Sequence, residues 1–585
     1  MKYSSIPSAQ TVVLYCKKRG IKNIVISPGS RNAPLTLGFT EDSFFNCFSI
    51  VDERCAAFFA LGMAQHLEMP VVAICTSGSA LLNYYPAVAE AFYSDIPLIV
   101  ISADRPSYKV DIGDGQTIRQ VGVFEKHIAY TASLRQDVVH ATSTIKKLAP
   151  NLLSKKTSPR EEQILIQNYN EEELAKLFDI NKDQNAPVHI NIPFEEPLYE
   201  LVKKPFELNF PEPQISTETI PEYPWDDLLQ LWNSSDKIMI IIGVSHPNTI
   251  HEEYLNLLAT KPNVIVFTEV TSNVNHPLFF PSIDSIIAPI EKSPDSDLLF
   301  KKLQPELLIT FGGLIVSKKV KAFLRDYKAD NHWHIDPKKA YNTFFSLTLH
   351  LKIEVNSFFE KIFLSNDPVK SNYLNTWKEV KQAYINKRES YLKQIPFSDF
   401  KVFEQVCRSI PSNYMLQLAN SSTVRYAQLF DMDPGVKVYC NRGTSGIDGS
   451  VSTAIGASIY YKSPTILITG DLSFLYDSNG LWNAHIRKDF RIIVINNGGG
   501  GIFRILPGKS DTPRYQTFFE TTQQLNLKMF CAIYGFDYEQ ASDQTSLKEK
   551  LQSFYLPSSL PVLLEVKTPR ILNDKILLAY FDFIS

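Results

Sequence analysis

The stretch PTILITGDLSFLYDSNGLWNAHIRKDFRIIVINNGGGGIFRILP, residues 464–507, decides the fold of this chain. Its two apolar runs, residues 465–469 and 491–495, are rich in β-branched side chains and are typical of buried parallel strands. The segment between them is long enough for a crossover helix, so the stretch predicts one βαβ unit. Ligands of such units bind at the carboxyl ends of the strands, where Asp471 and Asn497 fall.

Asp471 and Asn497 predict a magnesium site. A carboxylate and a side-chain amide, followed by a tight glycine turn, offer a small set of hard oxygen ligands. Mg²⁺ suits such a set because it takes few protein ligands and fills its other octahedral positions with phosphate oxygens and water. We expect Asp471, Asn497 and the carbonyl of Gly499 to hold the ion. Leu472 and Ser473 lead into the crossover helix, whose first N–H groups and positive dipole end can receive a phosphate.

The same pattern has a second interpretation without a ligand. Asp471 can be a helix cap, and Asn-Gly-Gly can be an ordinary turn. The rest of the chain has to decide between the two.

Length and composition indicate a globular protein of several domains. A chain of 585 residues holds about three or four domains, and 44% apolar with 21% charged residues is ordinary for a soluble protein. The net charge of −3 and the absence of a long basic run disfavour nucleic acid and anionic membranes as partners. Seven scattered cysteines without a CxxC pair favour reduced thiols over a zinc site or a disulfide framework.

The start of the chain lacks the features of a secretory signal, and its apolar runs are far shorter than the roughly 20 residues that span a bilayer. We therefore expect a cytoplasmic protein.

Three α/β regions follow one another along the chain. Residues 1–200 alternate strand-like and helical segments, as in a doubly wound domain. The proline-rich residues 201–224 predict a linker, and residues 225–365 predict a middle domain. The third region, 366–585, contains the βαβ unit. The other predicted strands are residues 23–27, 48–51, 70–75, 97–102, 187–192, 238–243, 264–268, 307–311, 332–335, 415–419, 436–440 and 561–566. We expect three doubly wound α/β domains, with the first and third of similar layout.

Glu53 is a candidate proton donor. It follows a predicted strand and precedes an alanine-rich helix. In one interpretation Asp52 is the N-cap and Glu53 interacts with the helix dipole. In the other, Glu53 is buried against Ala56, Ala57 and Phe58, where desolvation raises the pKa of its carboxyl group and lets it give a proton to a ring nitrogen.

Cations and other polar side chains gather just after the predicted strands or in their loops. Each alone is more typical of a surface ion pair or a helix cap. Together they favour substrates with several carboxylates, because arginine binds carboxylates in a bidentate way. The residues are Ser30, Arg31, Arg105, Gln116, Lys318, Lys319, Arg425 and Arg442. Ile447, flanked by glycines, and Ile502 and Phe503 after the glycine turn each fit either a core plug or a ligand contact.

With these motifs, the chain resembles the 2-succinyl-5-enolpyruvyl-6-hydroxy-3-cyclohexene-1-carboxylate synthases, transferases of menaquinone biosynthesis that depend on thiamine diphosphate (ThDP). The resemblance covers the whole chain and is weakest in the middle domain. The order Gly-Asp and then Asn is the Mg²⁺ and diphosphate signature, although Leu472 stands where a third glycine is usual. The shared motifs are SPGSRNAPLTL, DERCAAFFALG, CTSGSALLNYYPAVAEA, ADRP, GQTIRQ, NRGTSGIDGSVSTAIG, GDLSFLYDSNGL and NNGGGGIF.

The resemblance implies a reaction and its cofactors. 2-Oxoglutarate is decarboxylated on ThDP, and the succinyl carbanion equivalent adds to isochorismate in a 1,4-addition. The implied cofactors are ThDP and Mg²⁺, with Mn²⁺ as a substitute for Mg²⁺. A site shared between subunits implies a homodimer, or a tetramer of two such dimers.

The resemblance also assigns roles by position. Glu53 matches the acid at the aminopyrimidine N1′, and Gln116 joins it as a candidate catalytic residue. Ile447 matches the wedge that bends ThDP. Other matches are Ser421, Arg425 and Arg442 around the succinyl carboxylate and cofactor, and Ser30, Arg31, Arg105, Gln116 and Lys318 around isochorismate, with Lys319, Ile502 and Phe503 as further substrate candidates. Gly115 replaces a common Asn and Lys319 a familiar Arg, which leaves the fine positioning of isochorismate open.

Two rival functions remain at this point. One is another ThDP-dependent decarboxylase or carboligase acting on a different 2-oxo acid. The other is a non-catalytic diphosphate-binding regulatory protein on the same fold. Formation of CO₂ and the identity of the product distinguish the three.

Overall fold

A computed structural model describes residues 2–210, 221–364, 370–505 and 511–585. The chain forms two compact units whose sequence ranges interleave. Unit 1 comprises Met1–Thr217, Gly443–Lys462 and Tyr476–Phe490, and unit 2 comprises Glu218–Arg442, Ser463–Leu475 and Arg491–Ser585. Of the predicted linker, residues 211–220 lie outside the described parts, and its first residues form β8 (Leu201–Val202), which pairs with β1 (Tyr3–Ser4).

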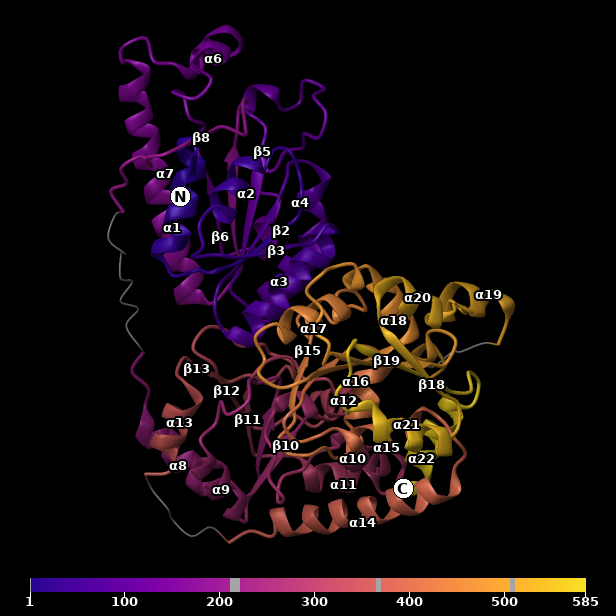
Figure 1. The fold of residues 1–585 in the computed structure, drawn as a ribbon. Coiled ribbons are helices and arrows are strands. Elements are labelled where there is room, and N and C mark those ends of the chain that lie inside the picture. Colours follow the sequence, from indigo (N-terminus) through magenta and orange to yellow (C-terminus); the bar gives the residue numbers. More distant parts are fainter. Residues whose placement is uncertain (1, 211–220, 365–369, 506–510) are drawn as a thin grey trace. The chain divides into compact units, whose positions relative to one another are not determined.

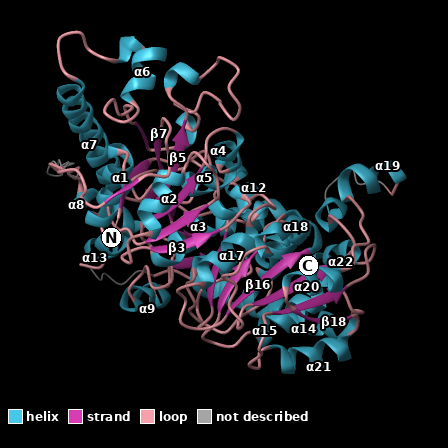
Figure 2. Ribbon diagram, turned by 45° about the horizontal axis from the view of Figure 1, so that its top comes forward, coloured by secondary structure: helices cyan, strands magenta, loops and turns pink. Residues whose placement is uncertain are grey.

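Unit 1 contains a six-stranded parallel sheet in the order β3-β2-β4-β5-β7-β6. Helices flank the strands (Figures 1 and 2). The strands are β2 (Asn23–Ile26), β3 (Asn46–Ser49), β4 (Val71–Cys75), β5 (Leu98–Asp104), β6 (Tyr130–Ser133) and β7 (Val188–Pro193). The helices are α1 (Pro7–Lys18), α2 (Ala33–Thr40), α3 (Glu53–Leu67), α4 (Ser79–Asn83), α5 (Tyr85–Tyr93), α6 (Thr142–Leu148), α7 (Pro159–Gln184) and α17 (Ser450–Ser458).

Unit 2 contains two parallel sheets. The five-stranded sheet has the order β10-β9-β11-β12-β13. Its strands are β9 (Ile238–Ile242), β10 (Val264–Thr268), β11 (Leu307–Phe311), β12 (Asn331–Ile335) and β13 (Leu349–Leu351). The helices from this part of the chain are α8 (Trp225–Ser234), α9 (Glu252–Thr260), α10 (Ile283–Lys292), α11 (Ser296–Leu303), α12 (Lys318–Asp326), α13 (Val355–Ile362) and α14 (Tyr373–Gln394).

The second sheet of unit 2 has six strands in the order β15-β14-β16-β17-β19-β18. Its strands are β14 (Met415–Leu418), β15 (Lys437–Cys440), β16 (Thr465–Gly470), β17 (Arg491–Asn496), β18 (Asp537–Ala541) and β19 (Val562–Lys567). The helices are α15 (Asp399–Ser409), α16 (Ser422–Ala427), α18 (Asp471–Tyr476), α19 (Pro513–Tyr515), α20 (Leu527–Tyr534), α21 (Gln544–Phe554) and α22 (Asn573–Ile584). α22 packs along the long helix α14 (Figure 1).

The predicted α/β fold is confirmed. Every predicted strand has a counterpart that differs by only a few residues, and β16 and β17 are parallel neighbours as expected. Along the chain, the strands of the two six-stranded sheets follow the same spatial order, so the predicted likeness of the first and third regions also holds. The strands that were not predicted are short or lie at sheet edges, where the apolar signal is weak. They are β1, β6, β8, β13 and β18.

The strand order locates the edge at which a ligand can bind. In each six-stranded sheet the order reverses between two central strands, β2 and β4 in unit 1 and β14 and β16 in unit 2. Ligands of doubly wound sheets bind outside the carboxyl ends of the strands at such a reversal. No helix in the described parts of the chain is long and apolar enough to cross a bilayer.

Candidate cofactor and substrate site

Asp471 and Asn497 extend from neighbouring strands of unit 2. Gly470 of β16 is paired with Ile495 of β17, so Asp471 and Asn497 both follow the carboxyl ends of paired strands. Asp471 is buried, and burial raises the pKa of its carboxyl group to about 6. One carboxylate oxygen accepts the N–H of Leu472 at 2.8 Å, and the other accepts Nε2 of Gln523 at 2.9 Å.

The glycine turn after β17 has a backbone that larger residues would not adopt. Gly498 has φ +78° and Gly499 has φ +146°, and a Cβ on Gly499 would lie 2.7 Å from the carbonyl oxygen of Glu520. The N–H of Gly500 donates to that carbonyl at 2.6 Å. The N–H of Gln523 donates to the carbonyl of Gly498 at 3.4 Å, so the turn is held from one side.

This donor set suits a small hard cation bound to a diphosphate. It offers a buried carboxylate, one amide oxygen and backbone carbonyls, which are hard oxygen ligands. A buried carboxyl group with a raised pKa is a group that a nearby cation would return to its charged form. Leu472 and Ser473 belong to the first turn of α18, and Ser473 is buried. The predicted residues therefore fit the predicted group chemically.

Two arginines of unit 2 lie in one electrostatic cluster. Arg442 donates from its terminal nitrogen to Oδ1 of Asn420 at 2.7 Å. Arg425, on α16, is half-buried, and its pKa is lowered by burial and by the neighbouring charge of Arg442. Ser421 caps the same short helix with φ +67°. A pair of neighbouring and partly buried guanidinium groups suits a carboxylate ligand.

Glu269 is a buried acid next to this cluster that the sequence did not reveal. Its carboxylate accepts the N–H groups of Val316 and Ser317, at distances between 2.7 and 3.0 Å. Burial raises its pKa to about 7, although the charge of Arg442 acts in the opposite direction. The acid thereby anchors the loop that leads into α12.

Three lysines in the first turns of α12 differ in exposure and in the groups that they contact. Lys318 is exposed, whereas the ammonium group of Lys319 pairs with Glu291 of α10 and lies over the ring of Phe581. Lys321 is half-buried, and its pKa is lowered by burial, with Glu269 opposing and Arg442, Arg325 and Arg425 adding to the shift. The predicted contact of Lys319 with a substrate stays a prediction, and its ammonium group here pairs with Glu291. Lys321 is the cation that was missed.

Glu53 is the first residue of α3 in unit 1. Asp52 caps the helix and accepts the N–H of Cys55 at 3.1 Å, so the capping interpretation of Asp52 is confirmed. Glu53 is half-buried in this chain, less than the buried acid that was predicted, and its Oε2 accepts Nδ2 of Asn83 at 3.3 Å. Its carboxyl group lies near the buried side chain of Tyr84.

The loop that carries Ile447 is fixed in unit 1 at both ends. Buried Glu90 of α5 accepts the N–H of Gly443 at 2.7 Å and both the N–H and the hydroxyl of Thr444 at 2.7 and 2.8 Å. At the other end Gly449 lies against the ring of Phe58 of α3, where a Cβ would come within 2.3 Å of the ring. Ile447 is 38% exposed, which fits the predicted contact with a ligand better than a core plug.

The remaining predicted residues of unit 1 are not gathered at one point. Ser30 and Gln116 are exposed, whereas Arg31 is buried and donates to the carbonyl of Phe194 at 3.0 Å and to Glu196 at 3.1 Å. Arg105 donates to the carbonyl of Gly115 at 3.2 Å. The Nε atoms of Arg31 and Arg105 are buried without a hydrogen-bond partner among the described residues, so both guanidinium groups retain donor capacity.

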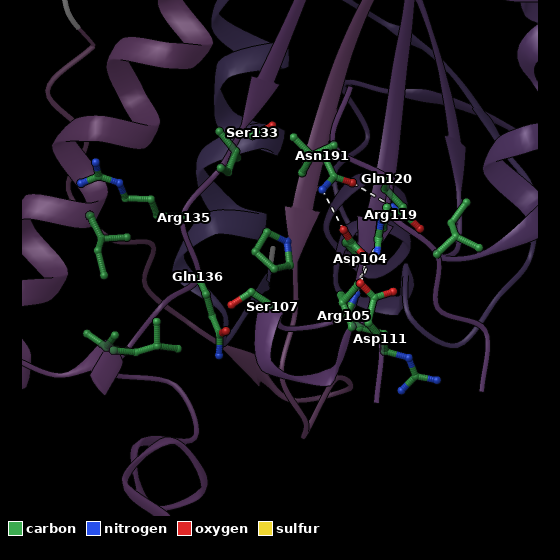
Figure 3. A pocket seen from close by; sticks show the side chains of 18 of the residues that line it. Asp104, Arg105, Ser107, Asp111, Arg119, Gln120, Ser133, Arg135, Gln136 and Asn191 are labelled. Atoms are coloured by element: carbon green, nitrogen blue, oxygen red, sulfur yellow. Dashed lines mark hydrogen bonds and ion pairs between the residues drawn. The ribbon is translucent and has the colours of Figure 1, made fainter. Parts of the chain in front are cut away.

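Arg105 also lines a cavity of about 730 Å³ at the carboxyl ends of β5, β6 and β7 (Figure 3). In that cavity Asn191 lies between Asp104 and Gln120, with hydrogen bonds of 2.8 Å to each. Burial raises the pKa of Asp104 to about 6. Arg31 and Gln116 do not line it, so the cavity alone does not unite the predicted isochorismate residues.

In unit 2, Ile502 and Phe503 form part of the turn after the glycines and are half-buried. The carbonyl of Phe503 accepts the hydroxyl of Tyr515 at 2.7 Å. Among the residues that the sequence did not single out, Asp399, Gln523, Glu269 and Lys321 are held close to predicted site residues. Of these, only Lys321 had a sequence signal, because it lies three positions after Lys318 on the same helix face.

Comparison with known proteins identifies two family domains and several similar full-length chains. Residues 8–129 match the family described as thiamine pyrophosphate enzyme, N-terminal TPP binding domain, and residues 420–566 match its C-terminal TPP binding domain. Three similar proteins bear the name 2-succinyl-5-enolpyruvyl-6-hydroxy-3-cyclohexene-1-carboxylate synthase. They come from Christiangramia forsetii (50% identity, 100% of both chains), Flavobacterium johnsoniae (49%, 99% of both) and Porphyromonas gingivalis (35%, 100% of this chain and 98% of the other).

Proposed function

The chain belongs to the 2-succinyl-5-enolpyruvyl-6-hydroxy-3-cyclohexene-1-carboxylate synthase family, and from this premise we propose how its own residues carry out the reaction. The enzyme is a ThDP-dependent transferase of menaquinone biosynthesis. It decarboxylates 2-oxoglutarate and adds the remaining succinyl group to isochorismate. The observation that carries the assignment of residues is the pair Asp471 and Asn497, which follow adjacent parallel strands and have the chemistry of a Mg²⁺ site.

Asp471, Asn497 and the Gly499 carbonyl hold Mg²⁺, or Mn²⁺ in its place, and through it the diphosphate. Leu472 and Ser473, in the first turn of α18, add backbone N–H groups for the phosphate oxygens. Support comes from the buried carboxylate of Asp471. When bound, ThDP supplies a nucleophilic thiazolium carbon and an electron sink for the pair of electrons released with CO₂.

Glu53 exchanges a proton with N1′ of the aminopyrimidine. The position of Glu53 at the first turn of α3, partly withdrawn from water and hydrogen-bonded to Asn83, supports this role. Ile447 would pack against the bound cofactor and set its orientation. Its exposure on a loop that Glu90 and Phe58 hold at both ends supports this second role.

The cations divide between the two substrates. Arg425 and Arg442, with Ser421, bind the succinyl carboxylate, supported by their shared electrostatic cluster in unit 2. Ser30, Arg31, Arg105, Gln116 and Lys318 bind isochorismate, and Gln116 contacts the reacting part of it. The Nε atoms of Arg31 and Arg105, which are buried without a hydrogen-bond partner among the described residues, support their part in this. Ile502 and Phe503 cover the substrate and exclude water.

We further propose that the protein acts in the cytoplasm as a homodimer or as a tetramer of dimers, with each active site shared between two subunits. The seven cysteines form no disulfide in the described parts of the chain, which agrees with a reducing compartment. We also propose three domains, residues 1–200, 225–365 and 366–585, with ThDP contacts contributed by the first and the third.

One experiment tests the proposal directly. Purified protein is incubated with ThDP, Mg²⁺ and 2-oxoglutarate, with and without isochorismate, and the products are identified by mass spectrometry. We expect CO₂ in both reactions and the cyclohexene carboxylate only when isochorismate is present. Replacing 2-oxoglutarate by pyruvate should abolish that product. CO₂ from pyruvate alone would identify a different 2-oxo acid decarboxylase, and no CO₂ from either acid would identify a non-catalytic protein.

A further inference from the structure

The amide of Asn497 is oriented by a second, buried carboxylate. Asp399, the first residue of α15, is 2% exposed. Its Oδ2 accepts Nδ2 of Asn497 at 3.0 Å, and its Oδ1 accepts the hydroxyl of Thr568 at 2.6 Å. The backbone N–H of Asp399 donates to Oδ1 of Asn573 at 2.8 Å, and Nδ2 of Asn573 donates to the Thr568 hydroxyl at 3.3 Å.

These contacts leave the carboxylate of Asp399 in one orientation. Thr568 follows β19, the strand next to β17, and its backbone N–H donates to the carbonyl of Asn496 at 3.0 Å. The hydroxyl of Thr568 can therefore donate to Asp399 from a fixed position. Each oxygen of the carboxylate receives one donor, so Asp399 presents an acceptor to the Asn497 side chain.

The consequence concerns the other end of the Asn497 amide. An amide whose nitrogen faces a carboxylate must direct its oxygen away from that carboxylate, because the two groups lie on opposite branches of one planar unit. If the side-chain amide of Asn497 were rotated by about 180°, its oxygen would face the carboxylate oxygen of Asp399. Its N–H₂ group would then point toward the proposed cation and could not coordinate it. Ligands of metal ions are commonly oriented by such outer hydrogen bonds.

We propose that Asp399 is a positioning residue that sets the polarity of the Asn497 amide and so turns its oxygen toward the cation. This inference rests on the proposed metal site. It goes beyond that site because Asp399 itself contacts neither metal nor substrate in the proposal. It predicts that metal affinity depends on which of the two side chains is the donor and which is the acceptor.

A reversal of the hydrogen-bond polarity tests this. In Asp399→Asn the new amide keeps its oxygen toward the Thr568 hydroxyl and presents N–H₂ to Asn497, which must then turn its own oxygen inward. In Asn497→Asp two carboxylates face each other. In the double variant, however, Asn at 399 donates to Asp at 497, whose second oxygen again faces the cation. The double variant should therefore recover what both single variants lose.

Binding of Mn²⁺ in the presence of ThDP, measured as loss of the free Mn²⁺ signal in electron paramagnetic resonance, is the readout. We expect about a 10- to 100-fold weaker affinity for Asp399→Asn, the range for outer partners of metal ligands, and recovery to within a few-fold of wild type in the double variant. Thermal unfolding without metal is measured in parallel. The control is Asp137→Asn, which changes another buried carboxylate held by Ser8 and Gln163, in unit 1, and should leave the Mn²⁺ affinity unchanged.

The outcomes separate the inference from the proposed function. Unchanged Mn²⁺ affinity in Asp399→Asn, or a double variant no better than the single ones, would overturn the inference while leaving the metal site in place. Equal losses of affinity in Asp399→Asn and Asp137→Asn would assign the effect to general destabilisation and also overturn it. A wild-type protein that fails to bind Mn²⁺ with ThDP would overturn the metal site and the inference together.

Discussion

Thr444 donates two hydrogen bonds to Glu90, from its backbone N–H at 2.7 Å and from its hydroxyl at 2.8 Å, although the two residues are 354 positions apart in the chain. The buried carboxylate of Glu90 thus holds the start of the Ile447 loop on α5. The helix that follows the loop, α17, packs closely against α3, because Gly62 and Gly456 each leave no room for a Cβ at the contact. The loop and Glu53 are therefore parts of one unit.

Replacing Glu53 by Gln tests its role as a proton donor. The amide keeps the size and can keep the hydrogen bond with Asn83, but it has no proton to exchange. We expect CO₂ release from 2-oxoglutarate to fall by roughly 10²-fold or more at saturating ThDP. Steady-state assays of CO₂ check this, and Asn83→Ala controls for the loss of the hydrogen bond alone. Near-normal turnover of Glu53→Gln would mean that another acid performs the step.

Asp477 should make the stability of unit 1 depend on pH. It is fully buried, accepts the N–H of Ser452 at 2.7 Å, and has a pKa that burial raises from 3.8 to about 6. The folded chain therefore holds this proton more strongly than the unfolded chain does. The protonated Asp477 therefore stabilises the folded chain at low pH, and this stabilisation is lost as the pH rises from about 4 to about 6. The free energy of unfolding falls by about 1.4 kcal/mol for each unit by which the folded pKa exceeds the unfolded one.

Thermal unfolding of Asp477→Asn between about pH 3 and about pH 7 measures this, because those limits lie about one unit outside the affected range. The midpoint of the variant should decline less than that of the wild type as the pH rises. Asp226→Asn, at an exposed position, is the control and should parallel the wild type. Parallel curves for Asp477→Asn and wild type would contradict the assignment of the raised pKa.

The sequence sufficed for the buried central strands and for the sheet edge at which they end, because buried parallel strands have long β-branched runs that need no tertiary information. Asp471 and Asn497 were found in the same way, since strand ends can be read from the runs themselves. The edge strand β18, with the sequence DYEQA, could not be found, because its half-exposed side chains lack an apolar pattern.

Long-range polar contacts could not be predicted either. Asp399 lies 98 positions from Asn497. Its local sequence, Ser-Asp-Phe at the start of α15, is that of an ordinary helix start. Lys319 shows the converse. The resemblance implies a substrate contact for it, but its ion pair with Glu291, on a different helix, could not be read from the sequence.

Asp471→Ala should abolish the metal-dependent part of ThDP binding. The variant removes the buried carboxylate and also leaves Nε2 of Gln523 without its partner, so we expect a small loss of stability together with the loss of affinity. Isothermal titration calorimetry with ThDP, in the presence of Mg²⁺ and again with EDTA, checks this. The wild type should bind much more tightly with Mg²⁺ than with EDTA, and the variant should bind equally in both. Unchanged ThDP affinity would remove Asp471 from the metal site.

Lys321 and Lys319 form a matched pair on one helix. Lys321→Met should raise the KM for 2-oxoglutarate roughly tenfold or more, because one charge-assisted carboxylate contact contributes about 1.5–3 kcal/mol. Lys319→Met should leave that KM unchanged, since its ammonium group is paired with Glu291. Steady-state kinetics of both variants decides. An unchanged KM for 2-oxoglutarate in Lys321→Met would contradict the role of Lys321, and a raised KM for isochorismate in Lys319→Met would support the substrate contact predicted for Lys319.

The division of cations between the two substrates can be tested by separating the two half-reactions. Arg425 lies with Arg442 in unit 2, so Arg425→Ala should slow CO₂ release from 2-oxoglutarate when isochorismate is absent.

Arg105 lies in unit 1, and its Nε is buried without a partner among the described residues, so Arg105→Ala should raise the KM for isochorismate by about ten- to hundred-fold. Its rate of CO₂ release without isochorismate should stay close to that of the wild type, because that step involves only the first substrate. Rapid-mixing measurement of CO₂ in single turnovers reports this step separately from the addition to isochorismate. If Arg105→Ala slowed it as much as Arg425→Ala did, the two groups of cations would not be divided by substrate, and both would have to act on 2-oxoglutarate.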